Sequence, residues 1–375
     1  MTERRIQIRC PEERLRVNEE NRRRLEACRS FLPTDRTPVL FSIALRYLFW
    51  ARGVEAGDYF ENPRTQLEQQ LLNQKWLIEH MMDDRYIDES QITVAPDLQN
   101  IRGGYFNIGV RWFQGMDPVA VPILEQPSDI EALEVPGVHE NLYGMKIEWY
   151  HAMKEMAPEY EVTLNGKPLE INVTVAAGGG PFPDAYALAR DKLFVWVYEA
   201  PQLVHMLMHK VTTAFINYNR YTRELTGAPL QHLSMGCDAA EMLSEEMFRE
   251  FVLPYYLQCY EAFPGNRGLH MCGKIDHLLR LLAEEMKITH LNGFGCVTDP
   301  RALAETMGGR VVMSGGIDPV LLLNGPKEQI KQECFKYMGI FSPVGGYILQ
   351  DGNNVAPGTS LANLATVIEA AEEFG

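Results

Sequence analysis

The chain has 375 residues, of which 46% are hydrophobic and 23% charged, an ordinary balance for a globular protein able to bury a full core. Its formal charge of −15 argues against nucleic acid as a partner, because a phosphate-binding surface needs the opposite sign. No run approaches about 18 uninterrupted apolar residues, which excludes a membrane span, and the charged N-terminus has no apolar segment of the secretory type.

These features predict a cytoplasmic protein. The seven cysteines are therefore expected to be free thiols, some of them candidate ligands, rather than a disulfide framework. The N-terminal stretch predicts a helical extension. Its basic residues, from Arg14 to Arg29, are expected to lie on a solvated helix face with acidic partners four residues away.

Short β-rich runs alternate with longer helical stretches, a pattern typical of repeated β-α units around a parallel sheet. Helices are predicted at Ser244–Phe263, Pro319–Met338 and Leu361–Phe374. Eight strands favour a closed (β/α)₈ TIM barrel over an open doubly wound sheet, and we expect a single domain over residues 1-375. The predicted strands are Pro38–Ile43, Ile92–Asp97, Ile171–Ala176, Leu230–Asp238, Gly268–Gly273, Thr289–Phe294, Arg310–Gly315 and Tyr347–Asp351.

One segment interrupts this alternation. Asn165-Gly166 lies between two runs of alternating apolar residues, which is a strong hairpin pattern. We therefore predict a hairpin excursion that leads into the third strand.

Reactive side chains of such a barrel belong at the carboxyl ends of its strands. His270 and Cys272 stand two apart at the end of the fifth predicted strand, so they point the same way. Imidazole and thiolate together suit Zn²⁺, but two ligands need a third. Cys296, Cys237, Asp238 and Asp351 are the candidates. The alternative is that Cys272 is a small buried apolar residue, as free cysteines often are.

Carboxylates are the second chemical resource at the strand ends. Asp97 and Asp238 each close a predicted strand, and Glu241 is expected to face the same cavity as Asp238. Asp299 and Asp318 each precede a proline and are interpreted as helix N-caps. The glycine-rich stretch Ala177–Phe182 has no nucleotide-binding spacing, and we interpret it as a tight turn that lets a ligand approach the main chain.

Five stretches in the same order resemble the uroporphyrinogen decarboxylase superfamily. The likeness runs from about residue 12 to the end and implies a (β/α)₈ barrel with its active site at the carboxyl face. The stretches are Asp35–Val39, Ser244–Tyr255, Leu269–Gly273, Ser314–Pro319 and Pro357–Leu364.

The superfamily contains cofactor-free decarboxylases and cobalamin-dependent methyltransferases. The decarboxylase branch has an arginine-rich loop after its first strand, and here Arg46 is kept while Ile43 stands where the first arginine would be. A substrate with many carboxylates needs several fixed cations, so one arginine among aromatic residues fits a smaller, more apolar ligand. Substrate contacts are expected from Arg46, Tyr47, Trp50, Asp97 and Asn353.

The methyltransferase branch matches His270 and Cys272, which resemble its zinc ligands. Its third ligand is a late cysteine, and the matching position here is Asn353, a poor zinc ligand. Either Cys296 or a carboxylate completes a zinc site with His270 and Cys272, or there is no metal. His270, Asp238 and Glu241 are the expected catalytic residues, acting as acids.

The resemblance therefore implies a corrinoid-dependent methyltransferase that demethylates a small methylated, for example methoxylated, substrate. Its expected partners are a corrinoid protein that carries cobalamin, a small-molecule methyl donor and, in a homodimer, a second copy of the chain. The alternatives are a decarboxylase of the uroporphyrinogen type, a non-catalytic ligand-binding homologue, and another lyase or hydrolase activity on the same barrel.

Overall fold

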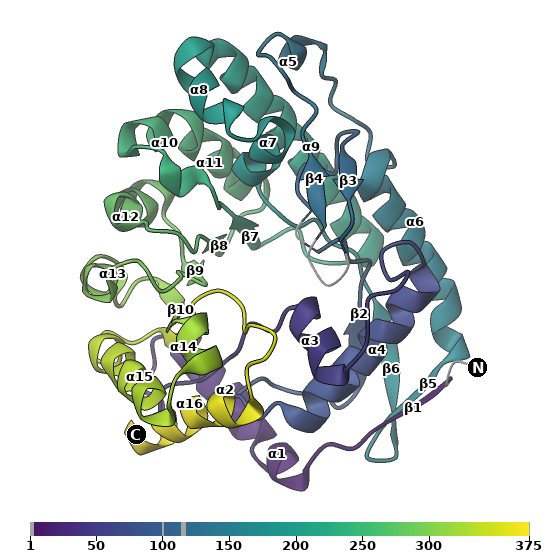
Figure 1. The fold of residues 1–375 in the computed structure, drawn as a ribbon, viewed down its shortest axis with the longest axis vertical. Coiled ribbons are helices and arrows are strands. Elements are labelled where there is room, and N and C mark those ends of the chain that lie inside the picture. The colour runs from purple at the N-terminus through teal and green to yellow at the C-terminus, as the bar shows by residue number, and fades with distance from the viewer. Residues whose placement is uncertain (1–3, 100, 114–117, 375) are drawn as a thin grey trace. The chain divides into compact units, whose positions relative to one another are not determined.

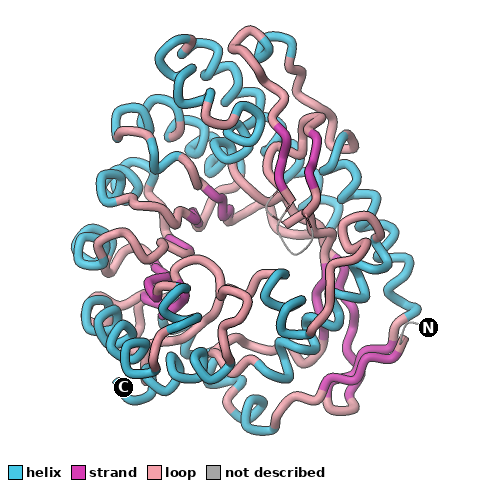
Figure 2. The backbone as a smooth tube through the Cα atoms, in the orientation of Figure 1, coloured by secondary structure: helices cyan, strands magenta, loops and turns pink. Residues whose placement is uncertain are grey.

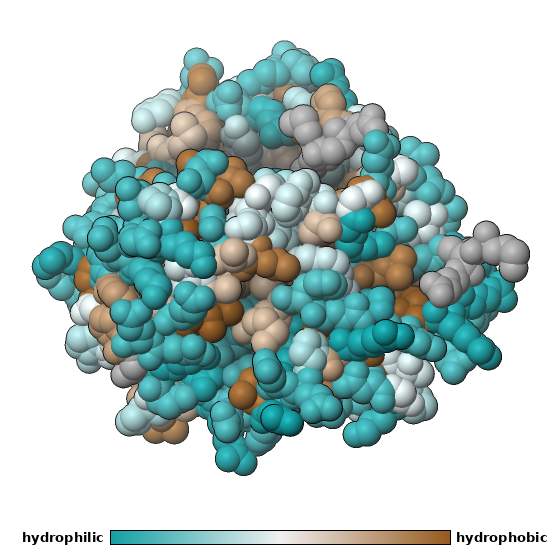
Figure 3. Space-filling view, turned by 60° about the horizontal axis from the view of Figure 1, so that its bottom comes forward, coloured by the Kyte–Doolittle hydropathy of each residue, from teal (hydrophilic) through white to brown (hydrophobic). Residues whose placement is uncertain are grey.

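The computed structural model describes residues 4–99, 101–113 and 118–374 and contains two compact units. Unit 1 comprises residues 1–95, 152–173 and 291–375, and unit 2 comprises residues 96–151 and 174–290. Each unit combines helices with parallel strand pairs, which agrees with the predicted α/β class (Figure 1). The face shown in Figure 3 is largely hydrophilic, with apolar side chains in small separate patches. No helix within the described ranges is both long and apolar enough to cross a membrane.

A four-stranded sheet of unit 1 contains the predicted hairpin. Asn165 and Gly166 have φ angles of 47° and 84°, the left-handed conformations that a two-residue type I′ turn requires. The side chain of Asn165 exchanges two hydrogen bonds with the main chain of Cys10, 155 residues earlier. The hairpin is thereby joined to the N-terminal strand (Figure 2). This strand is not among the eight predicted from the sequence. The strand order is β1 (Arg5–Ile8), β5 (Glu161–Leu164), β6 (Lys167–Val173) and β2 (Gln91–Val94).

The second sheet of unit 1 pairs β10 (Val312–Ile317) in parallel with β11 (Tyr347–Asp351). The rings of Phe294, Tyr337, Phe341 and Tyr347 pack against one another and form an aromatic core. The helices of this unit are α1 (Glu12–Arg16), α2 (Asn18–Arg29), α3 (Leu45–Arg52), α4 (Pro63–His80), α13 (Pro300–Met307), α14 (Pro319–Asn324), α15 (Lys327–Phe341) and α16 (Leu361–Phe374). The predicted closing helix at Pro319–Met338 is thus two helices, and the one at Leu361–Phe374 is confirmed.

The first predicted strand, Pro38–Ile43, is wrong as a strand, because only Val39 forms an isolated parallel bridge, to Leu349. Side-chain carboxylates take the place of strand pairing here. The main-chain N–H groups of Val39, Phe41 and Ser42 donate to Asp84, Asp83 and Asp351 at 2.7, 3.0 and 2.7 Å. The segment is extended and held in place without a continuous ladder.

The two aspartate N-caps predicted from sequence are confirmed. Asp299 accepts a hydrogen bond from the N–H of Arg301, and Asp318 accepts one from the N–H of Val320. The helical extension is confirmed too, although its face is not wholly solvated. Arg22 pairs with Glu19 and Glu26 as expected, whereas Arg14 and Arg24 are buried and bind main-chain carbonyls and carboxylates.

Unit 2 contains a parallel strand pair, an antiparallel ribbon and several helices. The predicted helix Ser244–Phe263 is two helices, broken at Val252 because Pro254 cannot continue the hydrogen-bond ladder. The rings of Tyr105, Tyr143 and Tyr218 form the aromatic core of unit 2. The parallel pair is β7 (Leu233–Gly236) with β8 (Arg267–His270), and the ribbon is β3 (Gly109–Arg111) with β4 (Val119–Val121).

The helices of unit 2 are α5 (Asp129–Ala132), α7 (Pro181–Ala189), α8 (Lys192–Glu199), α9 (Pro201–Thr226), α10 (Glu245–Phe251), α11 (Leu253–Ala262) and α12 (Leu279–Leu281). Two elements cross the boundary between the units along the chain. They are α6 (Asn141–Met156) and β9 (His290–Asn292). Short helical turns, Ala157–Glu159, Ala240–Met242, Asp276–Leu278 and Leu282–Met286, complete the described helical segments.

Replacing Asp84 by alanine should destabilise the protein strongly. Its side chain is 3% exposed and accepts hydrogen bonds from Arg24 and Arg36 at 2.7 Å. Removing it takes a carboxylate partner from Arg36 and leaves Arg24 with the carboxylate of Asp35 alone, which costs about 3–5 kcal/mol of unfolding free energy. Chemical denaturation measures this loss. Asp88→Asn in the same loop, where the carboxylate is exposed, is the matched control and should cost less than about 1 kcal/mol. Equal losses in both variants would contradict the assigned role of Asp84.

Candidate active site

Three side chains with metal-binding atoms meet at the carboxyl ends of β7 and β8. Nε2 of His270 lies 3.6 Å from Oδ1 of Asp238, and Sγ of Cys272 lies 3.7 Å from the same oxygen. All three ligand atoms are within 4.8 Å of one another. We call Asp238, His270 and Cys272 the strand-end triad. Among the described residues it is the one group of three or more such side chains close enough to hold an ion.

The parallel register of the two strands creates the triad. Gly236 is the partner of His270, and the N–H of Cys237 donates to the carbonyl oxygen of His270 at 2.9 Å. Ala239 then adopts a φ of 70°, a left-handed conformation that is rare for alanine and turns the chain directly after Asp238. Cys237 is fully buried and stands outside the triad, and burial holds the pKa of its thiol well above the ordinary range.

The electrostatics of the triad favour binding of a cation. Burial, and then the carboxylate of Asp238, raise the pKa of the Cys272 thiol to about 12. The thiol is therefore protonated at neutral pH and donates to Oδ1 of Asp238. A bound divalent ion would reverse this preference, because it favours the thiolate.

Glu241, predicted to share the cavity of Asp238, lies beside the triad. A Cβ atom placed on Gly273 would come within 2.5 Å of Cγ of Glu241, so the side chain packs directly over this glycine. Burial, and next the charge of Asp238, raise the pKa of Glu241. Its Oε2 is buried, with no hydrogen-bond partner among the described residues. Glu241 is therefore a carboxyl group that holds its proton more tightly than usual.

The predicted ligand Cys296 and substrate contact Asn353 belong to unit 1. They lie on neighbouring loops, because a Cβ on Gly352 would be 3.0 Å from Cβ of Cys296. Asn353 is exposed, and its Oδ1 accepts a hydrogen bond from the side chain of Asn354. Beneath them Asp351 is fully buried, and burial raises its pKa to about 8. The role of Cys296 as a third ligand stays a prediction.

The aromatic segment after Pro38 divides into core and surface. Tyr47 is fully buried on α3, and its hydroxyl donates to the carbonyl oxygen of Thr359 at 3.1 Å. Trp50, on the same helix, is 48% exposed and lies against the ring of Tyr47. Arg46 is partly buried. Asp97, the remaining predicted substrate contact, lies in unit 2 and accepts hydrogen bonds from the main chain and side chain of Gln99.

Unit 2 also holds a charged cluster that the sequence analysis does not identify. Lys146 is 8% exposed and Asp184 fully buried, and both interact electrostatically with Arg102. The cluster surrounds the glycine-rich stretch Ala177–Phe182. This stretch was the one feature of the sequence that pointed to a ligand near this turn. Nothing in a single sequence shows that a lysine in the middle of α6 is buried beside this turn.

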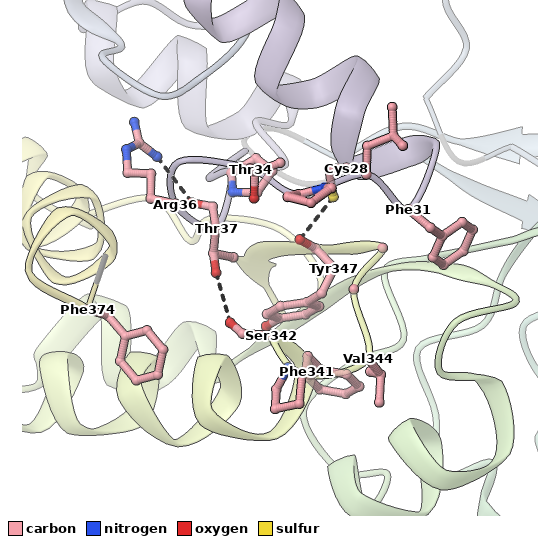
Figure 4. A pocket seen from close by; sticks show the side chains of 16 residues that line it. Cys28, Phe31, Thr34, Arg36, Thr37, Phe341, Ser342, Val344, Tyr347 and Phe374 are labelled. Atoms are coloured by element: carbon pink, nitrogen blue, oxygen red, sulfur yellow. Dashed lines mark hydrogen bonds between the residues drawn. The ribbon is translucent and has the colours of Figure 1, made fainter.

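A cavity of about 450 Å³ in unit 1 lies at the amino end of β11 (Figure 4). Its polar groups are already engaged: Cys28 donates to the carbonyl oxygen of Tyr347, and Arg36 pairs with Asp84. The amino ends of strands in α/β folds usually serve stability rather than chemistry. We therefore place the candidate active site at the strand-end triad.

Comparison with known proteins identifies the family. The family model described as uroporphyrinogen decarboxylase (URO-D) matches residues 19–374, which includes both units. A uroporphyrinogen decarboxylase of Xanthomonas campestris pv. campestris is 26% identical over 364 residues, covering 91% of this chain and 95% of that protein. One from Legionella pneumophila is 23% identical over 357 residues, covering 91% and 94%.

A solved structure extends the likeness to the fold. A methyltransferase from Methanosarcina mazei superimposes with a TM-score of 0.66 at 19% identity, covering 94% of this chain and 98% of that one. At this identity the match concerns the arrangement of strands and helices. The resemblance inferred from five short stretches is confirmed: the chain belongs to the uroporphyrinogen decarboxylase family.

Proposed function

We propose that this chain is a cytoplasmic methyltransferase that moves a methyl group from a small methylated substrate to a corrinoid protein. The observation that carries the proposal is the strand-end triad, because a His–Cys–carboxylate set belongs to metal-assisted chemistry. The similar fold of a protein called a methyltransferase supports it. We further propose that the strands of both units close into a (β/α)₈ barrel whose carboxyl face holds the triad.

The triad fits a zinc ion. Nitrogen, sulfur and oxygen donors within 4.8 Å of one another suit the short bonds of tetrahedral Zn²⁺, about 2.0–2.3 Å in length. Three protein ligands leave a fourth position open, as catalytic zinc sites do. Bound there, zinc would act as a Lewis acid toward the methyl donor. Asp238 thereby replaces the late cysteine ligand of the resembling branch, and Asn353 needs no role as a ligand.

Proton transfer is assigned to the residues of the triad and its neighbour. Asp238 accepts a hydrogen bond from the Cys272 thiol. When a cation binds, the thiol proton would be released to solvent, so that Cys272 and Asp238 are both ionised as ligands. Removal of a methyl group leaves an electron pair on the oxygen or nitrogen atom of the donor. Glu241, whose pKa is raised by burial, is the acid that protonates this atom. His270 orients the donor or serves as a second acid.

The decarboxylase activity of the relatives is the second candidate, since they align over most of the chain. The substrate of that reaction carries many carboxylates and needs several cationic side chains at the entrance of the active site. Around the segment after Pro38, however, Arg36 and Arg85 are committed to Asp84 and Asp83. Isoleucine at position 43 removes a further cation. These features favour methyl transfer over porphyrinogen binding.

The purified protein should methylate cob(I)alamin, or a corrinoid protein, from at least one class of donor. Methoxylated aromatics, methylamines and methylated thiols form the panel, and the absorbance change at cobalt follows the reaction. Glu241→Gln should lower the rate by about 100-fold, because it removes the acid and keeps the shape.

Two results would contradict this proposal. One is the absence of any spectral change at cobalt across the whole panel. The other is release of CO₂ from uroporphyrinogen with formation of coproporphyrinogen, which would place the chain with its decarboxylase relatives. Tight binding of a ligand without turnover would instead indicate the non-catalytic homologue.

Elemental analysis should find about one zinc ion per chain. Asp238→Ala and Cys272→Ala should each remove the ion, because each takes away a ligand of the triad. Cys296→Ala is the matched control and should retain it. If Cys296→Ala loses zinc while Asp238→Ala keeps it, the third ligand is Cys296 and our assignment of Asp238 is wrong.

Gly273→Ala should reduce methyl transfer by about tenfold or more, comparable with the loss of a positioned acid. The added methyl group meets Cγ of Glu241 at 2.5 Å and must displace that side chain. Gly339→Ala, where nothing lies within 4 Å of the new atom, controls for glycine replacement and should leave the rate unchanged. An unaffected rate in Gly273→Ala with a folded protein would argue against the position of Glu241 as the source of the acid.

A further inference from the structure

A second polar centre of unit 2 surrounds the turn Gly178–Gly180. Two cations, Arg102 and Lys146, and two carboxyl groups, Asp97 and Asp184, interact there. We call these four residues the turn cluster. It shares no residue with the strand-end triad.

Lys146 is the most unusual member of the turn cluster. It projects from α6, is 8% exposed, and its Nζ donates to the carbonyl oxygen of Ala176 at 2.7 Å. Nζ also lies 5.3 Å from the centre of the Tyr143 ring. Neither contact carries a full negative charge. A desolvated ammonium group is costly, and burial lowers the pKa of Lys146 to about 8, although the nearby charge of Asp97 partly opposes this shift.

Arg102 adds a second positive charge beside Lys146, and its charge further lowers the pKa of the lysine. The guanidinium packs over the turn. A Cβ on Gly179 would be 3.0 Å from Cδ of Arg102, and one on Gly178 would be 3.3 Å from Nη1. Gly179 also has a φ of 89°, so glycine is required there for both space and conformation. The turn is shaped around the arginine.

The carboxyl groups of the cluster do not balance these charges. Asp97 contributes one negative charge and accepts hydrogen bonds from Gln99. Asp184 is fully buried, and burial raises its pKa to about 7, so it is only partly ionised at neutral pH. Its Oδ1 accepts the N–H of Gly103, while its Oδ2 has no partner within the described part of the chain. The cluster therefore keeps an excess of positive charge.

The same turn borders the strand-end triad. The carbonyl oxygen of Gly179 accepts a hydrogen bond from the N–H of Gly236 at 2.9 Å, and Asp238 follows two residues later. A Cβ on Gly236 would lie 3.8 Å from Oδ2 of Asp238 and 3.9 Å from that carbonyl oxygen. An anion bound at the turn cluster would consequently be a neighbour of the triad.

We propose that Arg102 and Lys146 bind the carboxylate of the methyl donor and so present its methylated end to the strand-end triad. The inference rests on the proposed function and narrows its substrate class to donors that carry a carboxylate. Arg102 offers paired N–H donors that match the two oxygens of a carboxylate, and Lys146 offers a point charge behind them. The carboxylate supplies the counter-charge that Asp97 and Asp184 leave incomplete.

Calorimetric titration without any corrinoid tests the subsite apart from the reaction. Methoxyacetate and 4-methoxybenzoate are the probes, each compared with its neutral amide. At least one acid should bind about tenfold or more tightly than its amide, because charge-assisted hydrogen bonds discriminate between them. Arg102→Gln and Lys146→Gln should each remove this preference. Arg220→Gln, an exposed arginine on α9, is the matched control and should preserve it.

Equal binding of every acid and its amide, or no binding of any probe, would overturn the subsite. So would a preference that survives in Arg102→Gln and Lys146→Gln, provided that thermal unfolding shows both variants to be folded. Failure of the proposed function looks different. The acid preference and its loss in the variants would persist, while no probe would methylate cob(I)alamin.

Discussion

Three buried carboxyl groups hold the extended segment after Pro38 and thereby fix the approach of the chain to α3, the helix that carries Arg46 and Trp50. The bonds to Asp84 and Asp83, whose carboxylates pair with arginines, are charge-assisted and therefore stronger than the ladder bonds that they replace. The arrangement is also demanding, because Asp84 must be matched by Arg24 and Arg36 within the same interior. The bonds join Val39 to Asp84, Phe41 to Asp83 and Ser42 to Asp351.

The chemistry of unit 2 depends on close approach between loops. Glycines at positions 179, 236 and 273 leave no side-chain atoms between neighbouring strand ends, so charged groups from distant parts of the sequence come into contact. Glu241 occupies the space above one of them and Arg102 the space above another. Burial in this poorly hydrated region is the main cause of the shifted pKa values of Glu241, Lys146 and Asp184, and the neighbouring charges add to or oppose it.

Local patterns in the sequence were sufficient where the physics is local. The Asn165-Gly166 turn, the caps at Asp299 and Asp318, and the convergence of His270 with Cys272 all follow from spacing over a few residues. Hydrophobic periodicity could not show that carboxylates replace the ladder at Pro38–Ile43. It also could not show that Lys146 is buried, since a lysine within a helix usually lies in solvent and its partners are set by tertiary packing.

The pairing of β1 with β5 has a consequence for the order of folding. Ile8 lies opposite Leu164, and Cys10 is bound by Asn165, so the N-terminal strand has no sheet partner until the ribosome has made more than 150 further residues. Closing so long a loop is slow compared with forming a helix. During synthesis β1 therefore remains an unpaired strand, open to chaperones, while α1 and α2 already form behind it.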